Sequence, residues 1–347
     1  MTRKQRKLRV LVLMHKDLIP PDNLEDLSDQ RKAELKTEYD VLAALRKLGH
    51  EAVPIGLADE LGELRQQITD WKPHVAFNLL EEFHAVATYD QHVVGYLELM
   101  KQPYTGCNPR GMLLSQDKVL SKKILTYHRI LTPHFAVVPR NRKFRPLRKL
   151  KYPLFVKSAT EDASLGISQA SVVSNEEKLQ ERIEFIHEQT QSDALVEEYI
   201  EGRELYVGVM GNQRVVTYPV WELSIENVPD GSPLIATRKV KWDPQYQEKL
   251  GVKTGPARDL PPGMEERIAH VCRRIYRVLE MSGYARIDMR LSQDGRLYVL
   301  EANANPNLSR GEDFADTAKK AGVNYETLLS RIVQLGMAYH AAWRDQP

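Results

Sequence analysis

The sequence predicts an α/β lobe with a parallel sheet at the N-terminus, followed by structure of the α+β class. In the first third of the chain, apolar runs alternate with segments of helical periodicity, which is the pattern of βαβ units. Farther along, strand-like runs follow one another with few helices between them, which is typical of antiparallel sheets. The 347 residues also exceed what one hydrophobic core usually serves, so several lobes are expected.

Each element of the first lobe follows from an apolar run or from helical periodicity. The strands are expected at 8–14, 51–55 and 74–80. The helices are expected at 33–48, 59–71 and 87–100. A boundary near 111–115 ends this lobe, so we assign residues 1–114 to the first domain.

The rest of the chain, from residue 115 onward, contains most of the predicted strands. The helices are expected at 115–129, 175–189 and 263–282, with two more that begin near Gly311 and Val323. The strands are expected at 133–139, 154–158, 170–173, 194–200, 205–210, 215–223, 235–242, 284–292 and 296–302. Ser309 and Glu312 have the spacing of a capping box, and Gly322 is placed to end the helix that follows.

Composition restricts the class of protein. Hydrophobic residues make up 42% and charged residues 28%, which is ordinary for a folded protein, and a formal net charge of +2 gives no reason to expect nucleic acid. A basic run at 140–151 holds seven Lys or Arg and no acid. We interpret it as a solvated loop, with anion binding as the weaker alternative. No stretch approaches the roughly 20 apolar residues of a membrane helix, so no membrane partner is expected.

The N-terminus and the cysteines both fit a cytoplasmic protein. Basic residues precede an apolar run, as in a signal peptide, but the run is about half the usual length and lacks cleavage chemistry, so we interpret it as a strand. Only Cys107 and Cys272 are present, with no His or Cys cluster near either. The sequence therefore predicts no disulfide framework and no zinc site.

A β-hairpin is predicted near the C-terminus. Two strand-like runs flank Asp294-Gly295, the strongest short-range signal for a two-residue turn. Such a turn makes Gln293 face Arg296 and fixes the register of every pair farther out. One face of the hairpin then carries apolar residues, which we expect to face the core: Ile287, Met289, Leu291, Tyr298, Leu300 and Ala302.

The other face of the hairpin is polar. The register places Asp288 opposite Glu301, and Arg286 opposite Asn303. Two acids directly opposite each other, with Cβ atoms about 5 Å apart, destabilise a sheet unless a cation neutralises them. Two carboxylates and an amide oxygen suit Mg²⁺, and Arg286 beside them suits an anionic oxygen of a substrate. The alternative is a solvated acidic face balanced by Arg286, which leaves the pairing of the two acids unexplained.

The common phosphate-binding motifs are absent. The segment from Gly106 to Gly111 has the glycine spacing of a P-loop, but Met112 and Leu113 stand where Lys and Ser or Thr are needed. No G-x-G-x-x-G follows a strand, so a dinucleotide fingerprint is also missing.

The segment GYARIDMRLSQDGRLYVLEANANPNLS resembles the metal-binding signature of the ATP-grasp superfamily, and within it that of the D-alanine–D-alanine ligase-like carboxylate-amine ligases. The resemblance covers most of the chain. It implies the ATP-grasp fold, with a Rossmann-like lobe followed by two α+β lobes that clamp ATP. The two α+β lobes are then a central domain, residues 115–198, and a C-terminal domain, residues 199–347. It also implies that Asp288, Glu301 and Asn303 ligate Mg²⁺, or Mn²⁺ in its place, and that Arg286 stabilises an oxyanion.

Further segments resemble the phosphate-binding parts of this family in the same order along the chain. YTG followed by QDK implies that Lys118 is the first ATP-binding lysine, and YPLFVKS implies that Lys157 is the second. SATEDASLGIS resembles the mobile loop over the phosphates, which implies contacts from Ser164 and Gly166. In ATRKVKWDP, Lys241 is a predicted catalytic lysine that faces phosphate, with an exposed strand lysine as an equally good alternative.

The segment LVEEYIEGRELYVGVMGN resembles the adenine hinge and ribose segment of the family. The resemblance implies adenine contacts from Glu197, Glu198 and Ile200, the latter two through the backbone. It implies that Glu204 holds the ribose hydroxyls.

The activity implied is ATP-dependent ligation of a carboxylate to an amine through an acyl phosphate. The alternatives are a non-catalytic ATP-binding regulatory protein and a small-molecule kinase on the same scaffold. Dimers are common among similar ligases, so a homodimer is an expected assembly.

Three segments depart from the pattern of D-alanine–D-alanine ligases. LMHKDLIPPDNLEDLS lacks their glycine-rich loop with its glutamate, NLLEEFHAVATYDQH replaces their His-Gly segment, and NANPNLS lacks the usual proline-glycine pair. Because these segments concern substrate recognition, we expect an amino acid or small peptide other than D-alanine. Glu82, His84 and Asp90 either line that substrate pocket or only cap helices.

Overall fold

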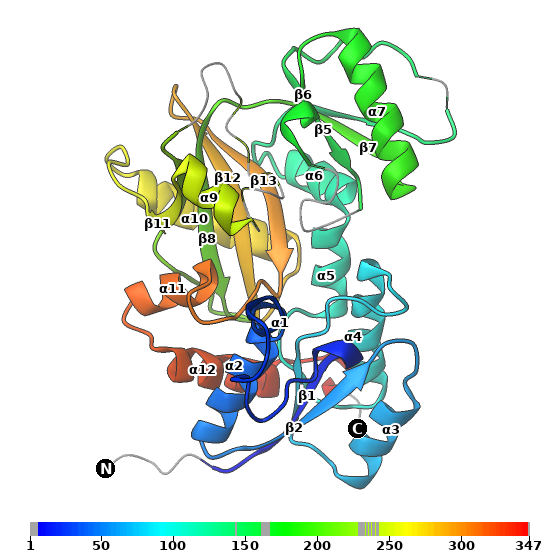
Figure 1. Cartoon of the computed structure of the whole chain (residues 1–347), viewed down its shortest axis with the longest axis vertical. Coiled ribbons are helices and arrows are strands. Elements are labelled where there is room, and N and C mark those ends of the chain that lie inside the picture. The colour runs from blue at the N-terminus through cyan, green and yellow to red at the C-terminus, as the bar shows by residue number, and fades with distance from the viewer. Residues whose placement is uncertain are drawn as a thin grey trace.

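The computed structural model describes residues 6–142, 144–160, 167–227, 233, 235, 237, 240 and 243–345, and within these residues it contains three β-sheets (Figure 1). The first sheet is parallel, the other two are antiparallel, and helices cover them. This mixed α/β and α+β architecture confirms the predicted fold class. The domain boundaries at 114 and 198 stay a prediction.

The N-terminal sheet has the strand order β2-β1-β3 and is buried on both faces. Its strands are β1 (Arg9–His15), β2 (Glu51–Leu57) and β3 (Val75–Asn78). Its helices are α1 (Asp29–Glu34), α2 (Lys36–Lys47), α3 (Gly62–Asp70) and α4 (Asp90–Leu99), with 3₁₀ turns η1 (Lys16–Leu18) and η2 (Ala87–Tyr89). Alternate residues of β1 enter two different cores: Val10 and Val12 pack with α2, whereas Leu11 and Leu13 pack with α3 and α4. Burial of both faces explains why β1 reads as an unbroken apolar run.

The C-terminal end of the chain completes the N-terminal lobe. Helices α11 (Asp313–Lys320) and α12 (Tyr325–Ala338) contribute to the same core as β1 and α2, and α12 lies beside α2 (Figure 1). Segments from the two ends of the sequence therefore share one hydrophobic core.

The central sheet has the strand order β4-β7-β5-β6 and carries charged residues on one face. Its strands are β4 (Phe135–Val138), β5 (Leu154–Ser158), β6 (Val172–Val173) and β7 (Ala194–Glu198). Its helices are α5 (Pro109–Gln116), α6 (Lys118–Tyr127) and α7 (Glu176–Thr190), with a 3₁₀ turn η3 (Gln169–Ser171). Val156 and Val196 pack with α7. Period-two alternation therefore turns Lys157 and Glu197 to the opposite face.

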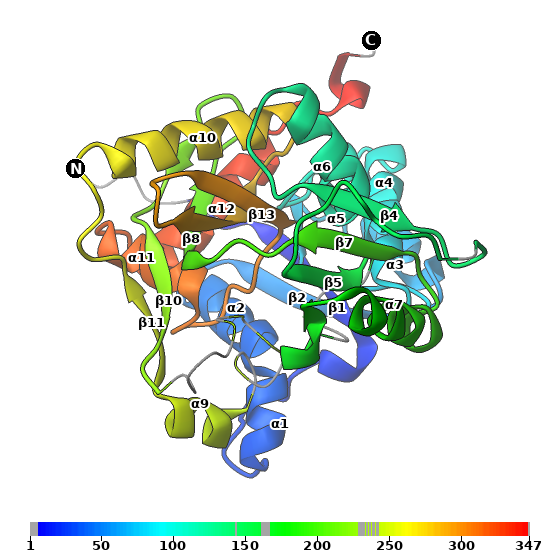
Figure 2. The ribbon, with the colours of Figure 1, turned by 90° about the horizontal axis from the view of Figure 1, so that it is seen from above.

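The third sheet has the order β11-β10-β8-β12-β13, with β9 paired to β8. Its strands are β8 (Gly202–Met210), β9 (Val216–Thr217), β10 (Trp221–Ile225), β11 (Val252–Pro256), β12 (Tyr284–Ser292) and β13 (Leu297–Ala304). The helices nearby are α9 (Pro244–Leu250) and α10 (Met264–Val278), and a 3₁₀ turn η4 (Ala342–Asp345) ends the described chain. Helix α10 runs along the apolar face of this sheet (Figure 2), where Ile287 and Met289 pack against Ile268 and Ile275. The polar face of β12 and β13 is thereby left for a site.

Several predicted elements need correction. The helix predicted at 115–129 is two helices, because Asp117 ends α5 and its carboxylate accepts hydrogen bonds from the backbone N–H groups of Val119 and Leu120. The helix at 33–48 is likewise divided, at Leu35, and the strand at 215–223 is two strands. The strand at 235–242 lies mostly outside the described residues, and Ile235, Thr237 and Val240 belong to no strand.

The predicted capping box at Ser309 and Glu312 is wrong. Glu312 itself is the N-cap of α11 and makes no side-chain capping hydrogen bond. The Ser309 hydroxyl lies 2.6 Å from that of Thr37 and donates to Asn307 instead. Gly322 does follow the end of α11 with a φ of 79°, as predicted.

The basic run at 140–151 is a loop, as predicted. The side chains of its described Lys and Arg residues are exposed, while Phe144, Leu147 and Leu150 pack against the core under α7. Within the described residues, no helix combines the length and the apolar composition that are needed to cross a bilayer.

Candidate active site

The hairpin of β12 and β13 presents the predicted polar pairs. Asp288 lies opposite Glu301, and Arg286 lies opposite Asn303. Nearer the turn the register differs from the prediction: the backbone N–H of Ser292 donates to the carbonyl of Arg296 at 2.9 Å, so the loop between them has three residues, 293–295. The pairing of Gln293 with Arg296 was therefore wrong.

A β-bulge restores the predicted pairs at the site. The register shifts between Asp288 and Met289, which leaves Leu300 as the extra residue of β13. As a consequence, Met289 pairs with Val299 rather than Leu300. Leu300 lines the cavity described below instead of entering the core, and Val299 takes its predicted core position.

Arg286, which is partly exposed, and the buried Asp288 form a bidentate ion pair on β12. Nε of Arg286 donates to Oδ1 of Asp288 at 2.7 Å, and Nη2 donates to Oδ2 at 2.8 Å. The guanidinium also lies 4.9 Å from the ring centroid of Tyr206. Burial alone would lower the pKa of Arg286, but the charge of Asp288 outweighs this and raises the pKa. Arg286 therefore stays cationic beside the metal position that the sequence predicted.

A second charge cluster lies on β5, β7 and α6. Glu197 is 3% exposed, and its two carboxylate oxygens lie 2.5 Å from Nζ of Lys122 and 3.2 Å from Nζ of Lys157. Burial would raise the pKa of Glu197, but the two ammonium groups hold it below its ordinary value. Burial lowers the pKa of Lys122. The predicted phosphate ligand Lys157 and the predicted adenine ligand Glu197 are thus in direct contact.

A third cluster joins β8 to β12. Nη2 of Arg290 donates to Oε2 of Glu204, and the hydroxyl of Tyr206 donates to Oε1 of Glu204 at 2.9 Å. Nη1 of Arg290 donates to the backbone carbonyl of Ile200 at 3.0 Å. Burial opposes the charge of Arg290, yet the neighbouring Glu204 raises the pKa of this guanidinium, so Arg290 stays cationic.

All three clusters line one cavity of about 760 Å³. The predicted site residues on its wall are Lys118, Lys157, Glu197, Glu198, Ile200, Glu204, Arg286, Asp288, Glu301 and Asn303. Ser164, Gly166 and Lys241 lie outside the described residues. Of the residues considered for the substrate pocket, Glu82 and Asp90 line the cavity, whereas His84 is not on its wall.

Further residues of the wall were not predicted. They include Gln116, Arg290, Leu300, Asn305, Asn307 and Glu312. The buried Lys122 was also missed, although it follows Lys118 by one helical turn on α6 and so shares its helix face. That spacing was the available signal, because two lysines on one buried helix face need an anionic partner.

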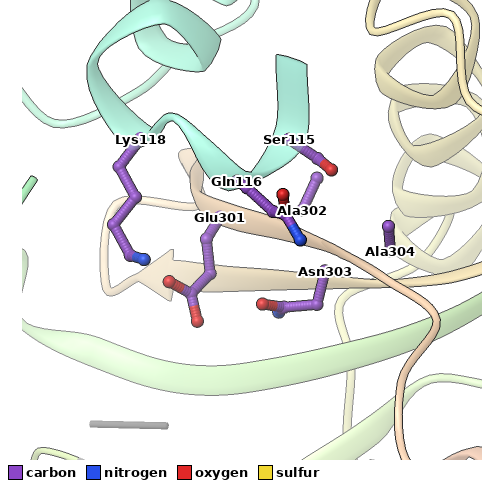
Figure 3. A pocket seen from close by; sticks show the side chains of 7 residues that line it. All are labelled: Ser115, Gln116, Lys118, Glu301, Ala302, Asn303 and Ala304. Carbon is purple, nitrogen blue, oxygen red and sulfur yellow. The ribbon is translucent and has the colours of Figure 1, made fainter. Parts of the chain in front are cut away.

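The strand β13 and the start of α6 enclose a narrow recess of about 50 Å³ at one end of this cavity. Figure 3 shows Glu301 and Asn303 pointing to the same side of β13, with the ammonium of Lys118 directed toward the carboxylate of Glu301. Lys118 is 7% exposed. The recess therefore holds a cationic group directly beside two of the three predicted metal ligands.

The donor set fits a hard divalent cation. Asp288 and Glu301 are opposite residues on paired strands, and the side chain of Asn303, which carries an amide oxygen, points to the same side of β13 as Glu301 (Figure 3). Each carboxylate oxygen offers two acceptor positions, so Asp288 can bind a cation while it accepts from Arg286. Among the described residues there is no group of three or more His, Cys, Asp or Glu that would compete for a metal.

The fold and these residues define the ATP-grasp class of ligases. Residues 124–334 match the family described as the D-ala D-ala ligase C-terminus. The chain is 30% identical over 320 residues to the D-alanine–D-alanine ligase of Carboxydothermus hydrogenoformans, which covers 90% of this chain and 96% of the relative. It is 31% identical over 307 residues, 85% of each chain, to an uncharacterized protein of Sinorhizobium fredii.

The structure is similar to the crystal structure of D-alanine–D-alanine ligase from Bacillus anthracis complexed with ATP. The TM-score is 0.72 at 24% identity, over 95% of this chain and 97% of that one. The chain belongs to the D-alanine–D-alanine ligase family. It is an enzyme of the ATP-dependent carboxylate-amine ligase class, and the comparisons give no support to a kinase or a non-catalytic regulator.

Proposed function

We propose that the 760 Å³ cavity binds Mg²⁺-ATP beside a carboxylate and an amine and joins the two substrates. The observation that carries this proposal is that one cavity wall holds every predicted site residue that the structure describes. These residues come from α6, two different sheets and the segment between β7 and β8. Ten residues from these separate segments would not be expected to line one cavity by chance.

The nucleotide takes the end of the cavity formed by β5, β7 and β8. Lys118 and Lys157 neutralise phosphate oxygens, Glu197 and the backbone of Glu198 and Ile200 meet the adenine, and Glu204 accepts from the ribose. Glu197 is already held by Lys157, so an arriving phosphate would share that ammonium with the carboxylate. Enclosure between the sheets excludes water from the phosphates.

Asp288, Glu301 and Asn303 hold Mg²⁺, with Mn²⁺ able to replace it because both prefer oxygen ligands. When bound, the metal neutralises negative charge on the phosphate oxygens. Arg286 is held in place by Asp288 and points its charge toward the same end of the cavity, where it stabilises the oxyanion that forms as the amine attacks.

The reaction proceeds in two balanced steps. An oxygen of the carboxylate attacks the γ-phosphorus, and the bond from this phosphorus to the β-phosphate oxygen breaks. The products of this step are ADP and an acyl phosphate. The amine nitrogen then attacks the carbonyl carbon, the bond to the phosphate oxygen breaks, and the nitrogen loses a proton as phosphate departs.

The substrates are a small peptide or an amino acid other than D-alanine. The relatives are named for D-alanine, but the cavity wall in this chain presents Asn305, Asn307 and Glu312 at the end away from the nucleotide segments. Glu312 is an acceptor for an ammonium group. Together with the changed N-terminal segments, these residues indicate a different substrate pair.

A screen of amines against carboxylates with purified protein tests this proposal. We expect ADP and phosphate to form with at least one pair, together with an amide product whose mass equals the two substrates minus water. Release of AMP would contradict the acyl-phosphate route, and a stable phosphorylated product would indicate a kinase instead. Cytoplasmic action fits the two cysteines, which are both buried and unpaired.

A further inference from the structure

Arg290 connects two segments of the cavity wall. It lies on β12 directly opposite Glu204 of β8, and the two strands run side by side (Figure 1). One of its nitrogens donates to Glu204, and another donates to the backbone carbonyl of Ile200. The side chain is 3% exposed. Protein groups, rather than water, therefore fix the guanidinium.

Glu204 is held from two sides and still has capacity to accept. Arg290 donates to Oε2 and the hydroxyl of Tyr206 donates to Oε1. Because each carboxylate oxygen has two acceptor positions, one position on each oxygen remains for a ligand. An ionised carboxylate only accepts, so it selects a ligand that carries two neighbouring hydroxyl donors.

The guanidinium also fixes a distance. Its planar donors have a rigid geometry, so the carbonyl of Ile200 and the carboxylate of Glu204 are held at one spacing. Tyr199, the residue before Ile200, packs its ring 5.3 Å from the same guanidinium. Tyr199, Ile200 and Glu204 all line the cavity. The buried side chain of Arg290 thus connects two parts of the proposed site. One is the backbone segment proposed to contact the base, and the other is the carboxylate proposed to contact the sugar.

We propose that Arg290 is a positioning residue that makes this enzyme selective for a ribonucleotide over a 2′-deoxyribonucleotide. The inference rests on the proposed function, because it requires ATP in this cavity. In this role Arg290 acts through Glu204 rather than through a contact of its own with the nucleotide. It places Glu204 at the depth where both hydroxyls of the ribose reach the carboxylate once the base is seated.

The test compares KM and kcat for ATP and 2′-deoxyATP in the wild type and in Arg290→Lys. The wild type should show a KM for 2′-deoxyATP at least about tenfold higher, since a hydrogen bond to a charged group is lost. Lysine keeps the positive charge but lacks the planar guanidinium that donates to Glu204 and Ile200 at the same time. The KM for ATP should therefore rise roughly tenfold, while the KM for 2′-deoxyATP changes little. The kcat should stay within about threefold, because Asp288 and Glu301 are unchanged.

Arg203→Lys is the matched control. Arg203 also forms a bidentate pair with a glutamate on a neighbouring strand, at 2.7 and 2.6 Å from Glu222, but neither residue lines the cavity. This variant should lose thermal stability without any change in the preference for ATP. Arg290→Gln, which retains one donor, replaces Arg290→Lys in the same assay if the lysine variant does not fold.

Each outcome decides the inference. A wild type that does not distinguish the two nucleotides overturns it without any variant. Equal changes in both KM values in Arg290→Lys show a purely structural role and also overturn it. If calorimetry shows that the wild type binds no Mg²⁺-ATP, the proposed function fails as well. Normal ATP binding with unchanged selectivity removes only the role of Arg290.

Discussion

The two ends of the cavity differ in how their acidic side chains are neutralised. At the end proposed to bind the nucleoside, Glu197 lies between two lysines, and the pKa of this carboxyl is held below its ordinary value. At the other end, burial and the neighbouring Asp313 raise the pKa of Glu312. On α2 nearby, burial raises the pKa of Glu38 to about 7, and the charge of Glu81 on the cavity wall adds to this. Nearby lysines therefore favour the charged form of Glu197, whereas burial disfavours the charged form of Glu312 despite the neighbouring Lys36 and Arg286.

This difference gives the two ends of the cavity different roles: the first end is preorganised before a ligand binds, and the second end selects the substrate. At the proposed nucleoside end, Lys122 and Lys157 lie beside Glu197, so this carboxylate keeps its position and charge before any ligand arrives. At the other end, burial and the neighbouring Asp313 outweigh the charges of Lys36 and Arg286 at Glu312, so a cationic ligand would supply the charge that still favours this carboxylate. We therefore expect changes at the first end to affect folding and ATP use, and changes at the second end to affect substrate choice.

The largest effect is expected from Lys122→Met. It leaves Glu197 buried with Lys157 as its only lysine partner, and removal of one partner of a buried pair costs about 3–5 kcal/mol of folding free energy. Lys123→Met is the control, because Lys123 is the next residue of α6 and is exposed. It should change stability by less than about 0.5 kcal/mol. Denaturant unfolding measures the change in unfolding free energy of both variants. Equal changes would remove the distinction between the two ends of the cavity.

Glu38→Gln should stabilise the protein at high pH. Glu38 is 4% exposed, and its Oε2 has no hydrogen-bond partner among the described residues. Its folded pKa of about 7 lies above the ordinary value of 4.5. Between these values the unfolded chain releases a proton that the folded protein keeps. Stability is therefore lost as pH rises through this window, by about 3 kcal/mol in full.

The measurement is the unfolding free energy of wild type and Glu38→Gln at pH 5 and pH 8. The advantage of the glutamine variant should grow from the lower to the higher pH, because glutamine cannot ionise. The exposed Glu63→Gln variant serves as control and should show no such growth. A pH-independent difference would show that Glu38 is compensated after all.

Glu301→Gln should lower turnover on the order of 100-fold or more, because it removes a charged ligand from the metal position. Unfolding free energy should change little, since Glu301 is only half-buried. Asp294→Asn, in the loop of the same hairpin, should keep full activity because Asp294 lies away from the cavity. Phosphate release at several Mg²⁺ concentrations measures the effect, and undiminished turnover would rule out Glu301 as a ligand.

The hairpin shows what the sequence could and could not predict. The pairing of Asp288 with Glu301 is confirmed, but two errors cancelled to give it. The Asp-Gly signal predicted a two-residue turn, whereas the loop has three residues, and the extra residue Leu300 in the bulge restores the register. Local turn chemistry can indicate a hairpin, but the bulge depends on how β12 packs against β8.

The charge clusters could be predicted only in part. Glu197 and Glu204 were found from their positions in a recognisable segment, but their partners Lys122 and Arg290 were not. Lys122 lies on helix α6 and Glu197 lies on strand β7, so their contact depends on tertiary packing. Arg290 meets Glu204 through the pairing of β8 with β12, which are separated by some eighty residues that no local pattern spans.

The smallest effect is expected from Glu312→Gln, and it sharpens the comparison most. Glu312 caps α11 without a side-chain capping hydrogen bond, so its loss should leave stability nearly unchanged. If it binds the ammonium group of the substrate, the KM for the amine should rise about tenfold, since a charged hydrogen bond becomes a neutral one. The KM for ATP should not move, because the nucleoside end is compensated by its own lysines and arginine. A rise in the KM for ATP instead would show that the two ends of the cavity are not independent.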